Sequence, residues 1–153
     1  MTSESPAKFA IGRVHLNPSP INPNWILDGN PVSCNKVLSS SADGTASTVI
    51  WDCTAGRFNW FYGIDETLYV IEGSVVIKDV TGVARRLGVG DMVYFPAGSH
   101  AEWSVEDYVR KVAFCRASLP RPLVFAKRGY RLLKRVLGRG GDKDVVSAMF
   151  SAD

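Results

Sequence analysis

The chain has 153 residues, a length that allows one domain with a hydrophobic core and a short appendage but not two domains. Hydrophobic residues make up 46% of it and charged residues 22%, a globular composition that excludes disordered, collagen-like and coiled-coil chains. No run of about 18 apolar residues is present, which excludes a transmembrane helix. The net charge is only +3, although it is unevenly distributed along the chain.

The opening MTSESPAKFA lacks the basic and apolar regions of a signal peptide. The chain has 3 cysteines, an odd number, and none are in CxxC spacing. We therefore expect a cytoplasmic protein with reduced thiols. The two histidines, His15 and His100, are too few for a three-histidine metal site.

Residues 1–24 are predicted to be an extended N-terminal arm. Pro18, Pro20 and Pro23 lie close together there, and proline is not compatible with a helix interior or a central strand. Trp25, Ile26 and Leu27 follow directly and are expected to attach the arm to the domain, which is predicted to span residues 25–118.

Between residues 46 and 116 the chain consists of short runs of β-branched and aromatic residues separated by turn residues. The runs are STVIWD, RFNWFY, TLYVIEG, SVVIKDV, VARRL, DMVYF, AEWSV and YVRKVAFC. Their spacing is typical of a sandwich or barrel, and no sustained helical periodicity is present. The sequence thus predicts an all-β jelly roll in which each run is one strand.

The C-terminal part differs in charge and in pattern. Residues 1–107 carry 7 basic and 12 acidic side chains, whereas residues 108–153 carry 11 basic and 3 acidic ones. Residues 119–141 are predicted to form a basic amphipathic helix, because its apolar residues recur at helical spacing. These apolar residues are Leu123, Ala126, Tyr130, Leu133 and Leu137. Residues 142–153 form a tail without a clear pattern.

The apolar stripe of this predicted helix needs a surface on which to be buried. Docking on the protein is favoured, because the acidic body attracts the basic segment. Peripheral membrane contact through residues 122–138 is the alternative. Nucleic acid is not an expected partner, because the basic portion has Tyr130 alone for stacking on bases.

Two motifs in the central region have a regular spacing: Glu66 is followed by six residues and Gly73, and Gly90 is followed by five residues and the proline-x-glycine of Pro96 to Gly98. Both motifs resemble those of the cupin superfamily. Together with WDCTAG, Trp103-Ser-Val and Val-Arg-Lys111-Val, the chain resembles single-domain cupins related to (S)-ureidoglycine aminohydrolase. The resemblance implies a double-stranded β-helix, the RmlC-like cupin jelly roll, and a homodimer.

The histidines of a metal-binding cupin are missing from this chain. Residues 59–63 replace the usual histidine-x-histidine pair, and Ala101 occupies the position of the third histidine. His100 lies one residue early, and since side chains alternate along a strand, we expect it to point away from the lumen. Glu66 alone remains of four ligands, so no metal is predicted and the cofactor is left open.

Glu66 and Lys111 are the candidate catalytic residues. A carboxylate in an apolar barrel can act as a general acid or base or bind a cationic group, or it can simply be hydrogen-bonded at the barrel mouth. Lys111 faces either the lumen, where it would form an acid–base pair with Glu66, or the outside; alternation does not choose between these directions. Trp60, Tyr62 and Trp103, together with Glu66, are the candidate ligand-binding residues, with lumen packing as the alternative role.

The sequence leaves three functions open. The first is a cupin that binds a small polar metabolite without a three-histidine metal site. The second is an enzyme similar to (S)-ureidoglycine aminohydrolase that acts on a small nitrogenous or carboxylated compound. The third is an interaction module anchored by its basic C-terminal helix. Whether the protein is an enzyme is not decided by the sequence, because one fold supports many activities.

Overall fold

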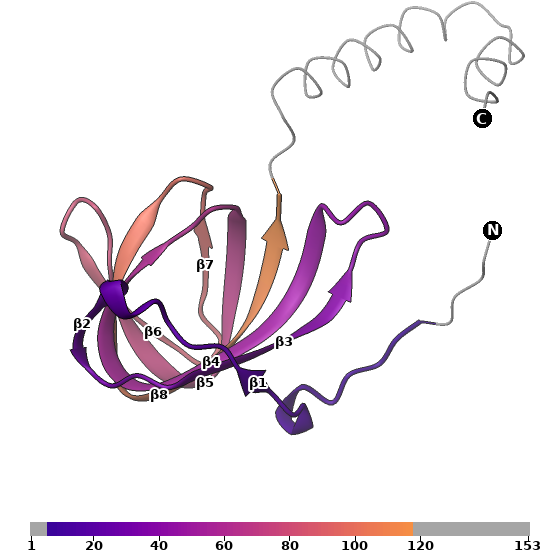
Figure 1. Cartoon of the computed structure of the whole chain (residues 1–153), viewed down its shortest axis with the longest axis horizontal. Coiled ribbons are helices and arrows are strands. Elements are labelled where there is room, and N and C mark those ends of the chain that lie inside the picture. The colour runs from indigo at the N-terminus through magenta and orange to yellow at the C-terminus, as the bar shows by residue number, and fades with distance from the viewer. Residues whose placement is uncertain (1–5, 118–153) are drawn as a thin grey trace, which may run out of the picture. The chain divides into compact units, whose positions relative to one another are not determined.

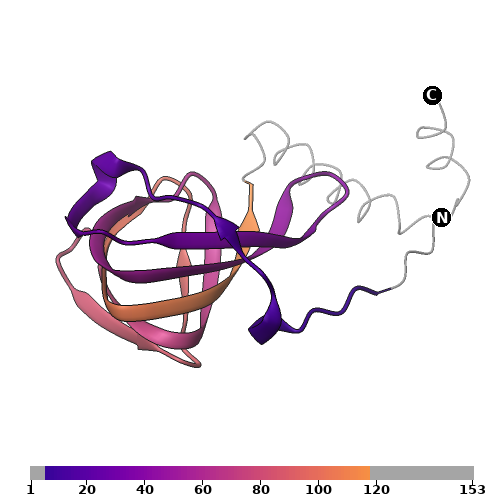
Figure 2. The same ribbon diagram turned by 60° about the horizontal axis from the view of Figure 1, so that its bottom comes forward.

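Eight antiparallel strands roll into a barrel (Figures 1 and 2). The computed structural model describes residues 6–117. The strands are β1 (Asn17–Pro18), β2 (Ile26–Gly29), β3 (Ser33–Ser40), β4 (Ala46–Phe61), β5 (Asp65–Lys78), β6 (Ala84–Gly88), β7 (Met92–Phe95) and β8 (His100–Arg116). The only helical segments in this part of the chain are the 3₁₀ turns η1 (Ile11–Arg13) and η2 (Pro23–Trp25). The all-β prediction is confirmed.

Three long strands form the centre of the sheet. Strand β8 lies between β4 and β5, and these three strands have 17, 16 and 14 residues. The free edge of β4 pairs first with β3 and then with β2, and the free edge of β5 pairs with β7 and β6. Each long strand therefore extends along the whole barrel and carries residues of both ends.

The prediction that the eight runs are eight separate strands is wrong. STVIWD and RFNWFY belong to one strand, β4, and the paired runs in β5 and β8 are likewise continuous. The register of β4 against β8 shifts between Thr54 and Gly56, and that of β5 against β8 shifts between Gly73 and Val76. Such bulges bend a strand without ending it, so these glycines mark bends rather than turns.

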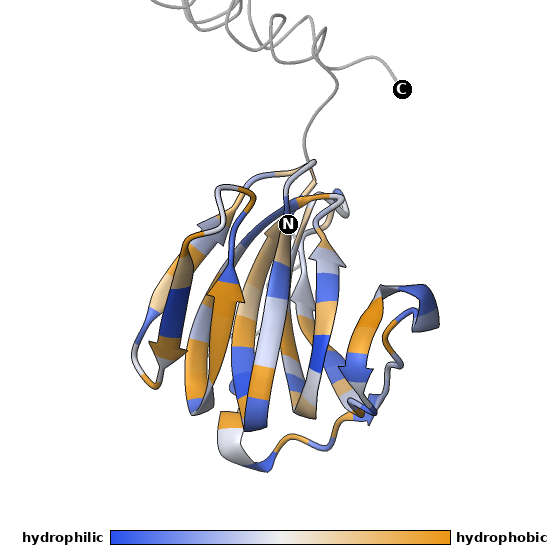
Figure 3. Ribbon diagram, turned by 90° about the vertical axis from the view of Figure 1, so that its left-hand side faces the viewer, coloured by the Kyte–Doolittle hydropathy of each residue, from blue (hydrophilic) through white to orange (hydrophobic). Residues whose placement is uncertain are grey.

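The core fills the inside of the barrel. Along β5, Glu66, Leu68 and Val70 are buried, whereas Tyr69 between them is exposed. The same alternation appears as successive orange and blue bands along the strands in Figure 3. Burying each large apolar side chain contributes about 1.5–3 kcal/mol, which makes this inward row a main source of stability.

The N-terminal arm is attached to the barrel at several points. Strand β1 pairs with β3, and Ile21 is buried in the core. The Arg110 guanidinium of β8 donates hydrogen bonds to the backbone carbonyls of Ile11 and Val14 at 3.1 and 3.2 Å. Arg110 therefore holds residues 11–14 of the arm against the barrel.

The attachment through residues 25–27 differs from the expectation in one residue. Trp25 and Ile26 pack against the core, and the Trp25 ring lies 5.7 Å from that of Trp60. Leu27, by contrast, is 44% exposed. It lies in β2 next to Ile26, and neighbouring side chains on a strand point to opposite faces.

The predicted basic helix at 119–141 and the tail at 142–153 lie outside the described residues. Docking of this helix on the protein or on a membrane surface therefore stays a prediction. Within residues 6–117, no helix has the length and apolar character needed to cross a bilayer.

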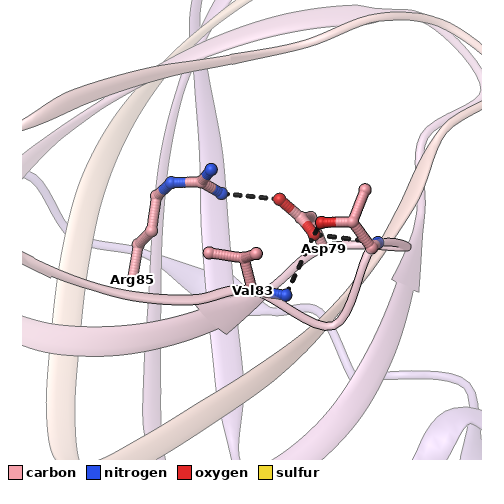
Figure 4. A network of polar contacts seen from close by, with 4 residues as sticks. Asp79, Val83 and Arg85 are labelled. Carbon is pink, nitrogen blue, oxygen red and sulfur yellow. Dashed lines mark hydrogen bonds and ion pairs between the residues drawn. The ribbon is translucent and has the colours of Figure 1, made fainter.

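The turn between β5 and β6 is organised by one carboxylate, Asp79 (Figure 4). It accepts hydrogen bonds from the backbone N–H groups of Thr81 and Val83 at 2.9 and 3.3 Å, and from the Thr81 hydroxyl. Its other oxygen accepts from the Arg85 guanidinium at 2.6 Å. The hydrogen bond from the Thr81 hydroxyl, followed by that from Arg85, lowers the pKa of Asp79 from 3.8 to about 2.

We expect the Asp79 carboxyl to titrate near pH 2 in the folded protein, as measured by its carboxyl carbon chemical shift. Because the pKa of the folded state lies below the ordinary value, these contacts stabilise the turn at neutral pH. Their contribution is lost as the pH falls from about 4 towards 2. Asp79→Ala should remove this titration signal and so assign it. A carboxyl signal of Asp79 that titrates near pH 4 would contradict the expectation.

Candidate functional site

Lys111 lies inside the barrel, at the centre of the sheet. In β8 it is opposite Trp51 of β4 on one side and Val70 of β5 on the other. Its inward neighbours along the strand, Val109 and Ala113, are also buried. Lys111 therefore faces the lumen. Side-chain alternation along the strand left this direction open.

Glu66 is the partner of Lys111. The Lys111 ammonium donates a hydrogen bond to Glu66 Oε1, and the two groups form an ion pair. The Lys111 and Glu66 side chains are 4% and 11% exposed. Attraction between the two charges is strong in such surroundings, because little water screens it.

Three tryptophan rings surround the ammonium group. The Lys111 Nζ atom lies 4.9 Å from the ring centre of Trp103, 5.1 Å from that of Trp51 and 6.0 Å from that of Trp60. These distances fall within the range of cation–π attraction, which is strengthened when the cation is shielded from water. The rings stabilise the positive charge and form apolar walls on several sides of it.

Tyr62 is buried beside this cluster. Its hydroxyl accepts a hydrogen bond from Trp103 Nε1 at 3.1 Å, and its ring stacks on Phe95 at a centroid distance of 4.2 Å. Burial, together with the negative charge of Glu66, raises the pKa of Tyr62 far above its usual range. The phenol therefore stays protonated and supplies a hydrogen-bond donor.

Cys115 lies opposite Glu66 in the pairing of β8 with β5. Burial and the charge of Glu66 raise its pKa, and Lys111 opposes this shift. A raised pKa disfavours the thiolate, which is the reactive form of cysteine. Cys115 therefore acts as a small hydrophobic residue of the lumen.

The positions of the missing histidines are occupied as the strand alternation predicted. Ala101 and Trp103 are buried in the lumen, whereas His100 is exposed and stacks on Phe61 at 5.5 Å. Glu102, on the same face as His100, forms surface ion pairs with Arg57 and Lys78. Within residues 6–117, no three His, Cys, Asp or Glu side chains are grouped so that they could hold a metal ion.

All five residues selected from the sequence meet in one place. The five residues contact the ion pair or its aromatic surroundings, and they come from β4, β5, β8 and the position directly after β4: Glu66, Lys111, Trp60, Tyr62 and Trp103. Trp51 was missed, although it lies in the WDCTAG segment. Its place became visible through the register of β4 and β8, in which it is the direct neighbour of Lys111.

Known proteins share this architecture. A family model described as the EutQ-like cupin domain matches residues 40–113. The Clostridium difficile EutQ protein is 22% identical with a TM-score of 0.57, over 72% of this chain and 86% of that one. A protein of unknown function from Pseudomonas syringae pv. tomato is 27% identical with a TM-score of 0.62, over 67% of this chain but only 45% of that one.

The polyketide cyclase RemF from Streptomyces resistomycificus has 15% identity and a TM-score of 0.56, over 76% of this chain and 82% of that one. No curated protein matches the chain. At such identities the solved structures establish the fold, and the family model establishes the type of domain. The barrel is a cupin domain, and residues 40–113 match the EutQ-like type.

Proposed function

We propose that the barrel binds a small polar metabolite in its lumen, oriented by Lys111 and Glu66 and bordered by indole rings. The observation that carries this proposal is the buried Lys111–Glu66 ion pair with three tryptophan rings around its ammonium group. Small-molecule sites are typically apolar surfaces with a few convergent polar groups, and this lumen has that composition.

Stability alone gives a weaker account of the ion pair. Removing two charges from water costs several kcal/mol per ion, and apolar residues of similar size often stabilise a protein as well or better. A polar pair inside a barrel is therefore a candidate for recognition. Binding in this proposal needs no three-histidine metal site, since Trp60, Tyr62 and Ala101 occupy the lumen there.

The second candidate is an enzyme similar to (S)-ureidoglycine aminohydrolase, acting on a small nitrogenous or carboxylated compound. What favours it is the direct contact of Lys111 with Glu66, because two titratable groups in hydrogen-bond reach can exchange a proton. Glu66 would accept a proton from the substrate and Lys111 would stabilise developing negative charge. Loss of the metal-binding histidines counts against this chemistry, because it relies on a metal-polarised substrate.

Binding should depend on the ion pair and not on surface charge. We expect the double variant Glu66→Gln/Lys111→Met to remain folded, since both new side chains are neutral and similar in size, and to lose ligand binding about a hundredfold or more. The measurement is calorimetric titration with compounds that raise the melting temperature of the unsubstituted protein, drawn from a panel of small acids, amides and amines.

The matched control removes an ion pair from the outside of the barrel. Lys78 and Glu102 lie 3.3 Å apart on the surface, and Lys78→Met/Glu102→Gln should bind every ligand as the unsubstituted protein does. If the double variant in the lumen kept full affinity, the proposal would be wrong. Release of product from a bound compound would favour the enzyme over the binding protein.

A further inference from the structure

A groove with a volume of about 540 Å³, which is within the range of small-molecule sites, lies on the outside of the barrel. Phe114 of β8 lines it. Since Lys111 and Ala113 are buried on the inner side of β8, Phe114 points to the opposite side, and it is 48% exposed. Lys111 and Glu66 are not among the residues that line this groove. The groove is therefore separate from the site in the lumen.

Five strands contribute one residue each to a row that crosses this groove. Phe114 pairs with Thr48 of β4 and with Thr67 of β5. Farther out, Thr48 pairs with Ser39 of β3, and Thr67 pairs with Tyr94 of β7. All five residues line the groove. One exposed aromatic ring thus lies in the middle of the row, and each of the other four strands supplies a side-chain hydroxyl.

The carboxylate of Asp65 is held in a fixed position at the groove. Its Oδ1 atom accepts hydrogen bonds from the backbone N–H of Ala97 at 2.9 Å and from the Tyr94 hydroxyl at 3.2 Å. Its Oδ2 atom accepts from the Arg116 guanidinium at 2.8 Å. The hydrogen bond from the Ala97 N–H, followed by that from Arg116, lowers the pKa of Asp65 and so keeps it ionised at neutral pH. Arg116 also lines the groove, and its side chain is 72% exposed.

The charges of the lining residues cancel. Asp65 carries one negative charge and Arg116 one positive charge, and the other lining residues, all of them in the described part of the chain, are neutral. A charged ligand that is attracted by one of these two groups is repelled by the other. A neutral ligand with hydroxyl groups meets no such opposition, because a hydroxyl can donate to Asp65 and accept from Arg116. The exposed ring of Phe114 favours a ligand that also has an apolar face.

We infer that the groove is a carbohydrate site, in which a neutral pyranose ring packs its C–H face on Phe114 while its hydroxyl groups bind Asp65 and Arg116. A pyranose combines both properties, because its hydroxyls project mostly from the rim and its C–H groups lie on the faces. The face of an aromatic ring is negative and attracts the slightly positive C–H hydrogens. Hydrogen bonds to ionised groups are about twice as strong as those between neutral groups, so Asp65 and Arg116 orient the sugar. This inference does not depend on the function proposed for the lumen.

The test is saturation-transfer NMR of the full chain with neutral and charged sugars, at a slightly acidic pH where an amino sugar is protonated. The neutral probes are the methyl pyranosides of glucose, galactose and mannose, and the charged probes are glucuronate and glucosamine. Irradiation of the protein's aromatic protons should transfer saturation to the C–H protons of a neutral sugar, because the ring contacts them directly. Silence of all the sugars, or a stronger signal from a charged one than from the neutral ones, would overturn the inference.

Phe114→Leu should weaken the binding of that neutral sugar about tenfold, since leucine has no aromatic face. Phe61→Leu is the matched control, because Phe61 is also 48% exposed but does not line the groove. It should bind the sugar as the unsubstituted protein does. If Phe114→Leu kept full affinity, the inference would be wrong.

The lumen variant Glu66→Gln/Lys111→Met separates the two sites. It should keep the sugar signal, because neither residue lines the groove. A signal that is lost in this variant and kept in Phe114→Leu would place the sugar in the lumen, which supports the proposed function and overturns this inference. If the sugar binds through Phe114 and no compound of the metabolite panel binds in the lumen, the proposed function fails and the carbohydrate site stands.

Discussion

Replacing Lys111 by methionine should lower the free energy of unfolding by about 3–5 kcal/mol, the loss expected when one partner of a buried ion pair is removed. The reason is the group left behind. Glu66 keeps a carboxylate with a side-chain exposure of 11%, and its counter-ion is gone. Methionine fills most of the lysine volume, so lost packing contributes little. Urea denaturation measures the change.

Adding Glu66→Gln to this variant should restore most of the lost stability. The double variant has no charge in the lumen, and a neutral interior is often as stable as a buried ion pair. The double-mutant cycle then reports a large coupling energy between the two sites, as expected for residues in direct contact. If the losses of unfolding free energy in the Lys111→Met and Glu66→Gln single variants were simply additive in the double variant, the two side chains would not form an ion pair in solution.

Replacing Gly73 by alanine should destabilise the domain by about 4 kcal/mol or more, among the largest effects of a single substitution. Gly73 has φ +68°, and a Cβ atom there would lie 2.0 Å from the backbone oxygen of Tyr108. Two costs therefore add: left-handed backbone strain of about 1–2 kcal/mol, and a clash with β8 that only a backbone shift can relieve. Thermal unfolding of the purified variant measures the effect.

Gly82→Ala is the matched control for this prediction. Gly82 also has a positive φ, +82°, but nothing lies within 4 Å of the position of its Cβ. This variant should lose only the strain of about 1–2 kcal/mol. Equal losses of stability in Gly73→Ala and Gly82→Ala would show that the close approach of Gly73 to Tyr108 has no energetic consequence.

The structure also explains why the motif that begins at Glu66 ends in a glycine, Gly73. Gly73, which is separated from Glu66 by six residues, lies where β5 shifts its register against β8. Its missing side chain lets the backbones of β5 and β8 come together at this bend. The close approach of the two backbones thus explains why the motif has a glycine at this position.

Strand-forming residues, turn residues and the cupin spacing were sufficient to predict an all-β barrel with Glu66 in its lumen. The outward direction of His100 also followed from the sequence, because Ala101 is its neighbour and adjacent side chains on a strand point to opposite faces. These are local properties. They depend on the order of residues along one strand and not on which strand lies beside it.

The direction of Lys111 and the membership of Trp51 in the site were decided by the tertiary structure. Alternation divides a strand into two faces but does not say which face is inside; the pairing of β8 with β4 and β5 does. Continuity of the long strands was hidden for a similar reason, since a bulge and a turn both appear in the sequence as a glycine between β-forming runs. The ion pair itself joins residues 45 positions apart, and only the register that brings two strands together places such residues in contact.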